Sequence, residues 1–163
     1  MAKPSKWFLP LVLGTLLGAC APAAKPEPPA LVPAGADAAA LAADPCALRM
    51  QDIAGAMLVY YNAHHGTLPP TLEALAAASP GAALELTSPG SGKPFAYFPA
   101  GLSAPGESRQ LLLYDPAPVH AGWRWGIVAS TVDANQPLIM LVVPLEERVL
   151  KSYLPAAAPQ PRE

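Results

Sequence analysis

Apolar residues recur at three- and four-residue intervals in the stretch CALRMQDIAGAMLVYYNAHH, which follows Asp44-Pro45. This spacing is typical of one helix face, which would carry Leu48, Ile53, Met57, Tyr60 or Tyr61, and His64. Asp44 can cap the first free amides, and Pro45 suits the first helical position. Because Gly66 can adopt left-handed dihedrals, the pattern predicts a helix of about five turns that ends there.

Shorter patterns follow along the chain. A second, short helix is predicted over residues 71–78, and Pro144 is predicted to start a last helix in LEERVLKSYL. Strands are predicted in apolar or aromatic runs between turn-forming residues, over 95–98, 111–114, 123–130 and 138–143. We therefore expect an α+β domain over residues 44–154, with one long N-terminal helix packed on a small antiparallel sheet. Residues 155–163 are predicted to form a disordered tail.

The N-terminus reads MAKPSKWFLPLVLGTLLGAC, a short positive region followed by an apolar core and small residues. This order is typical of an export signal and is too short to predict a spanning helix. Its end, Leu17-Gly18-Ala19-Cys20, resembles the lipobox of bacterial lipoproteins. The resemblance implies that residues 1–19 are removed and that Cys20 carries a diacylglycerol and an acyl lipid. The alternative is an ordinary signal peptide with a chance cysteine.

Residues 20–43 are rich in alanine and proline and predict a semi-rigid tether after the lipidated cysteine. The resemblance implies a cell-envelope protein that reaches the membrane through its lipid anchor while its folded part stays in water. Ala21, in place of an aspartate after the lipobox, implies the outer membrane, facing the periplasm.

The charge balance argues against a nucleic-acid partner. The 163-residue chain has 10 basic and 12 acidic residues, a formal net charge of −2, and its basic residues are scattered. A chain with no cationic surplus has little with which to neutralise a phosphate backbone. We therefore expect no nucleic-acid binding, and partners among other envelope proteins.

The domain as a whole resembles the type II secretion major pseudopilins and their relatives. The motifs are CxxxLRxIxxAMxxYYxxxxGxLPPxLxxL, then LxLTSPxSGKPFAYFP and LLLYDPAPVHAGWRW, from Cys46 to about Leu150. The resemblance implies a non-enzymatic structural or protein-interaction role in type II secretion or a pilus-like assembly. The chain departs from the family in its lipobox and tether, in Thr87-Ser88 where relatives often have a second cysteine, and in Asp133-Ala134-Asn135 where they often have Asp-Gly-His.

Four aromatic residues have two-residue spacing, which places the members of each pair on one face of a strand: Phe95 with Tyr97, and Trp123 with Trp125. One interpretation is that they pack the sheet against the helix that begins at Cys46. The other is an exposed interaction surface for a peptide or glycan. The second interpretation gives the alternative function, an envelope ligand-binding module.

The histidines do not predict a metal site. His64 and His65 are adjacent and would point about 100° apart on a helix, so they cannot chelate one ion as an i, i+4 pair would. A site that also used His120 is conceivable, but no spacing requires it. Carboxylates near Asp115 and Asp133 are too few for calcium.

No catalytic residues are predicted. Asp115 and His120 could be drawn into a triad with a serine, but the chain lacks the glycine-flanked nucleophile elbow. The GSGKP sequence at residues 90–94 lacks the upstream glycine and the magnesium-binding hydroxyl of a phosphate loop. We expect no enzyme activity and no cofactor. Cys46 is predicted to be a buried small hydrophobe, with a reactive or intermolecular thiol as the alternative.

Overall fold

The computed structural model describes residues 43–81, 83–118, 120, 122–130 and 137–155. The predicted signal peptide, the lipidation residue Cys20, nearly all of the tether, the turn at residues 133–135 and the tail beyond residue 155 lie outside this part of the chain. Within the described residues, no helix combines the length and hydropathy needed to cross a bilayer.

The helix predicted after Asp44 is α2, Pro45–Ala63. Asp44 Oδ1 accepts hydrogen bonds from the backbone amides of Cys46 at 2.8 Å and Ala47 at 3.3 Å, so the predicted N-cap forms. The helix ends where the amide of His64 bonds to the Tyr60 carbonyl at 2.9 Å. Gly66 follows with a φ of +82°, the left-handed conformation predicted for it.

Four antiparallel strands form one sheet in the order β1-β2-β3-β4. The strands are β1 Ala96–Ser103, β2 Arg109–Tyr114, β3 Trp123–Ser130 and β4 Met140–Glu146. This sheet with its helices confirms the predicted α+β class. β1 begins one residue after the predicted start at 95 and extends five residues beyond the predicted end at 98. Its pairing with β2 shifts register between Tyr97 and Leu102, where Gly101 has a φ of +70°.

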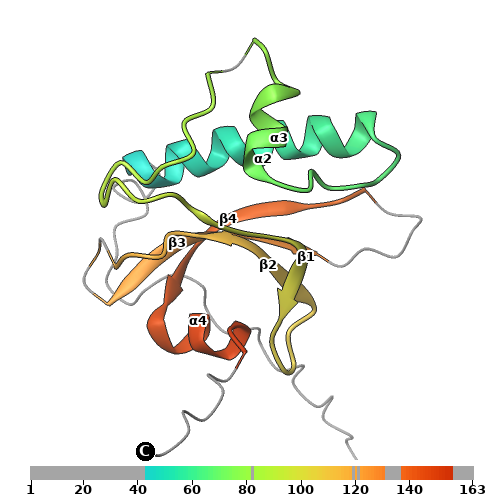
Figure 1. The fold of residues 1–163 in the computed structure, drawn as a ribbon. Coiled ribbons are helices and arrows are strands. Elements are labelled where there is room, and N and C mark those ends of the chain that lie inside the picture. Colours follow the sequence, from blue (N-terminus) through green and yellow to red (C-terminus); the bar gives the residue numbers. More distant parts are fainter. Residues whose placement is uncertain (1–42, 82, 119, 121, 131–136, 156–163) are drawn as a thin grey trace, which may run out of the picture.

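Helices cover both faces of the sheet (Figure 1). On one face lie α2 and the short α3, Leu72–Ala77, which Thr71 caps as an acceptor from the Ala74 amide at 3.1 Å. On the other face lies α4, Glu147–Tyr153, near the C-terminal end of the described chain.

Two apolar clusters lie between the sheet and these helices. The first joins α2 and α3 to the sheet, with Met50, Ile53, Met57, Leu75 and Ile127 among its buried residues. The second lies under α4, with Leu111, Val128, Leu145, Leu150 and Tyr153.

The prediction that Pro144 starts a helix is wrong. Pro144 lies inside β4, opposite Trp125, and the helix begins three residues later at Glu147. A proline cannot donate to a strand ladder, but β4 is at the edge of the sheet, where an amide can be spared.

Arg124 connects α4 to the strands. Its guanidinium is buried and contacts Glu147 Oε2 at 2.5 Å, and it also donates to the Pro116 carbonyl at 2.8 Å. The carboxylate partner and the carbonyl together offset the cost of removing this charge from water. The second helical layer is therefore joined to the sheet by a polar link as well as by apolar packing.

Candidate functional site

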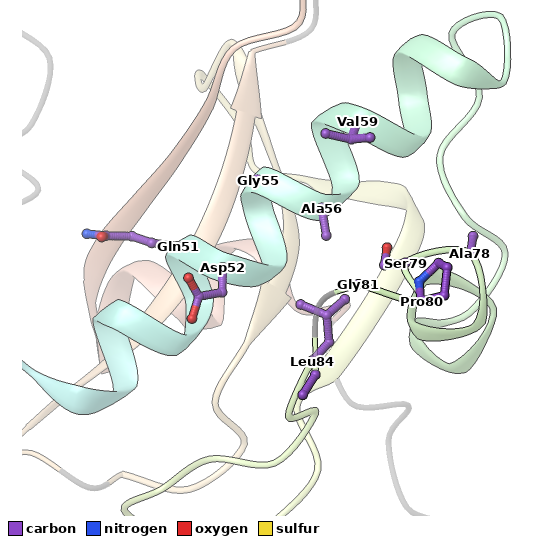
Figure 2. A pocket seen from close by; sticks show the side chains of 11 residues that line it. Gln51, Asp52, Gly55, Ala56, Val59, Ala78, Ser79, Pro80, Gly81 and Leu84 are labelled. Carbon is purple, nitrogen blue, oxygen red and sulfur yellow. The ribbon is translucent and has the colours of Figure 1, made fainter.

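An apolar groove runs between α2 and the segment that follows α3 (Figure 2). It has a volume of about 630 Å³. Gln51, Asp52, Gly55, Ala56 and Val59 lie on the α2 side, and Ala78, Ser79, Pro80, Gly81, Ala83 and Leu84 on the other. Small side chains dominate this lining, so the groove is open along the helix.

The segment that follows α3 forms the second wall of the groove. Contacts with α2 beyond the groove hold this segment near the helix. Arg49, on α2, donates to the Thr87 carbonyl at 2.9 Å and forms an ion pair with Glu85. At Gly55 an added Cβ would meet nothing within 4 Å. Val59 is 70 % exposed although it is a large apolar residue. An exposed valine beside a concave apolar surface is suited to contact with an apolar segment of another protein.

The four aromatic residues all belong to the layer between the sheet and α2. Phe95 and Trp125 are buried, at 5 % and 4 % exposure, whereas Tyr97 and Trp123 are half-buried and pack against the same cluster. Packing against the helix, the first interpretation of their spacing, is therefore their observed arrangement. A ligand on this surface would reach the half-buried pair and not the buried pair.

The Tyr97 hydroxyl is also held from inside the protein. It donates to the Pro69 carbonyl at 2.7 Å, and burial raises the pKa of Tyr97 to about 12. The phenol therefore stays neutral at physiological pH and fixes the extended turn before α3 against β1.

Trp123 has a different set of neighbours. Its ring stacks on His120 with centroids 4.1 Å apart and an interplanar angle of 8°. The Trp125 ring approaches it edge-on at 5.2 Å. These contacts fix the orientation of the His120 imidazole at the start of β3.

His120 lies at the N-terminal end of α2, where three potential metal ligands meet. One ligand atom from each of Asp44, Cys46 and His120 lies within 4.8 Å of the others. His120 Nε2 is 3.4 Å from Asp44 Oδ2, and a cavity of about 180 Å³ opens beside them, lined also by Pro45, Pro89 and Gly90.

Cys46 is buried in the first turn of α2, at 3 % exposure, which confirms the prediction of a buried residue. Its sulfur lies 3.8 Å from the hydroxyl oxygen of Ser88, which is itself buried. Burial raises the pKa of the Cys46 thiol, and the Ser88 contact opposes this shift. The thiol is a weak nucleophile in this environment.

The residues considered for a hydrolytic triad do not come together as one. Asp115 Oδ1 accepts a hydrogen bond from the Ala117 amide at 3.0 Å and lies 3.5 Å from Ser91 Oγ. His120 Nε2 instead faces Asp44. Asp115 thus forms a turn at the end of β2, a structural role for a fully buried carboxylate.

The three histidines are likewise separated. His64 caps the C-terminus of α2 and stacks on Tyr60, whereas His120 lies beside Asp44 at the other end of the helix. A 19-residue helix is about 28 Å long, so these histidines cannot share an ion.

Sequence reasoning missed the group of Asp44, Cys46 and His120. The sequence suggests Asp44 as a helix cap, Cys46 as a buried hydrophobe or a reactive thiol, and His120 as a partner of the other histidines or of Asp115. The sequence holds one local signal for metal ligands, the spacing Asp44-x-Cys46. This signal is weak, because a capping aspartate followed by any buried residue gives the same spacing. The 73 residues between Cys46 and His120 carry no ligand spacing that predicts their meeting.

Comparison with protein-family models, curated proteins and solved structures finds no match for this chain. The resemblance to pseudopilins rests on the sequence motifs.

Proposed function

We propose that this chain is a lipid-anchored, non-enzymatic protein of the bacterial cell envelope that acts through contacts with other proteins. Cys20 would hold it at the outer membrane, facing the periplasm. The lipobox Leu17-Gly18-Ala19-Cys20, directly after an apolar export segment, is the observation that carries this proposal.

The domain's role is proposed to lie in type II secretion or a pilus-like assembly. The pseudopilin-like motifs from Cys46 to about Leu150 support this assignment. The order of a 19-residue helix followed by an antiparallel sheet agrees with what those motifs imply. A tether of residues 20–43 in extended conformation would span about 70 Å, at about 3.1 Å per residue. That reach would let the domain meet assemblies in the periplasm while its anchor stays in the membrane.

The groove beside α2 is the proposed contact surface. Its exposed valine, its small lining residues and its open shape suit an apolar segment of an assembly component. Gly55 gives a way to fill the groove, because a Cβ added there meets no atom within 4 Å and lysine is a better helix former than glycine.

In-cell crosslinking of the tagged full-length protein, with mass spectrometry of the captured proteins, tests this function. The wild type is expected to capture secretion or pilus-like components, and Cys20→Ala to lose them. Gly55→Lys is expected to reduce capture about tenfold or more, since it places a charge and four methylenes in the groove. Asn62→Lys is the matched control, an exposed α2 residue outside the groove, and should capture as the wild type does.

Two results would contradict the proposal. Capture of only the protein itself or peptidoglycan-associated proteins by the wild type would remove the assembly role. Equal capture by Gly55→Lys and Asn62→Lys would remove the groove from it.

The alternative function is an envelope ligand-binding module for a peptide or glycan. The half-buried Trp123, next to the cavity at the N-terminus of α2, favours it. Titration of the full-length protein with peptidoglycan fragments, glycans and peptides should then shift the tryptophan fluorescence. The shift should disappear in Trp123→Phe, which leaves Trp125 as the tryptophan of the folded domain. No shift across the panel would eliminate this function.

A further inference from the structure

We propose that Asp44, Cys46 and His120 form a binding site for a zinc-type divalent metal ion. This inference does not depend on the proposed function, and it departs from the expectation of no metal site. The donors are a carboxylate oxygen, a thiolate sulfur and an imidazole nitrogen, which zinc accepts together in proteins.

The spacing of the three donor atoms fits one ion. Ligand atoms bound tetrahedrally at about 2.0–2.3 Å lie about 3.3–3.8 Å from one another. Asp44 Oδ2 and His120 Nε2 are 3.4 Å apart, and the Cys46 sulfur lies within 4.8 Å of a carboxylate oxygen of Asp44 and of a ring nitrogen of His120. Only a small movement of the cysteine side chain is needed to complete the set.

The donor atoms are available for an ion. Asp44 uses Oδ1 for the two capping hydrogen bonds, so the cap and an ion at Oδ2 are compatible. His120 Nε2 is buried and has no hydrogen-bond partner among the described residues, an arrangement that costs free energy unless something binds there. A protonated His120 could pair with Asp44 alone, but such a pair would not involve the sulfur.

The framework around the donors is ordered by contacts that do not use them. Stacking on Trp123 sets the His120 ring, and the first turn of α2 holds Cys46, whose buried thiol would lose its proton on binding the ion. Ser88 N bonds to the Lys93 carbonyl at 2.8 Å, which holds the turn containing Pro89 and Gly90 at the cavity wall.

The electrostatics also fit a divalent ion. One carboxylate and one thiolate balance two positive charges, and the neutral imidazole adds a third bond without charge. The cavity of about 180 Å³ leaves room for a fourth ligand, a water molecule or a group from a partner. A three-residue site with an open position is thus the expected coordination.

Cobalt titration of the full-length chain carrying Cys20→Ser, which leaves Cys46 as the only thiol, tests the site. The protein is expected to bind one Co²⁺ and to develop the near-ultraviolet absorption of a cobalt–thiolate bond, which Zn²⁺ then abolishes by displacement. Cys46→Ser should remove that absorption. His120→Asn should weaken binding about tenfold or more, as loss of a ligand does, while His65→Asn, the matched control at an exposed histidine, should not.

Asp44→Asn provides a variant that keeps the fold, because asparagine caps helices as well as aspartate does. It should retain the circular dichroism spectrum and weaken cobalt binding. The site is refuted if the parent chain shows no thiolate absorption with Co²⁺. It is also refuted if that absorption survives in Cys46→Ser, or if Asp44→Asn binds as tightly as the parent.

Discussion

Ile53→Ala is expected to lower the free energy of unfolding by about 2–5 kcal/mol, the range for truncating a large side chain in a packed core. Ile53 is fully buried on the face of α2 that meets the sheet, in one cluster with Met50 and Met57. The substitution removes three side-chain carbon atoms. It would leave a cavity that α2, packed on the sheet, cannot close. Urea unfolding of the full-length protein, followed by the fluorescence of Trp123 and Trp125, measures the change.

Val59→Ala is the control for this prediction. Val59 is a β-branched residue on the same helix, but it is 70 % exposed. Its truncation should change stability by no more than about 0.5 kcal/mol, since little apolar area is uncovered. Since alanine is the better helix former at both positions, similar losses in both variants would contradict the assignment of the Ile53 effect to burial against the sheet.

Cys20→Ala is expected to abolish lipid labelling of the chain completely. The lipobox cysteine is the proposed attachment point, and no other thiol can replace it if Cys46 is buried in the folded domain. Cells grown with radioactive palmitate would show label in the wild type and none in Cys20→Ala. The precursor mass should also persist, because processing before residue 20 follows lipid attachment in the proposed pathway.

Cys46→Ala provides the matched control for labelling. It removes the other thiol and should leave the label intact. Label that persists in Cys20→Ala, or that disappears in Cys46→Ala, would remove Cys20 as the attachment point and assign the N-terminus to an ordinary signal peptide.

Local chemistry made part of the fold predictable. Asp44, Pro45 and Gly66 mark the ends of α2 through hydrogen bonds and dihedrals that involve only their neighbours in sequence. The two-residue spacing of Trp123 and Trp125 also placed both rings correctly on one face of β3.

Other features depended on information that is not local. Pro144 is compatible with a helix start and with an edge strand, and only the position of β4 in the sheet decides between them. The second apolar layer under α4 was missed for the same reason. In the candidate metal site, His120 pairs with Trp123 and also reaches Asp44, so the chain returns to the start of α2 after two strands of the sheet. No spacing within the sequence encodes that return.

If the proposed lipid anchor holds the chain at a membrane, the prolines of the sheet have a consequence for crowding there. Both outer strands contain one, Pro99 in β1 and Pro144 in β4, and β4 also exposes Leu141 beside it. Chains tethered to one surface meet at a raised effective concentration, which favours strand addition between neighbouring molecules. Pro144 has no amide hydrogen to offer a strand added to β4, so an incoming strand would find an interrupted ladder there. The same residue that misled the helix prediction would thus help a densely anchored protein to remain dispersed.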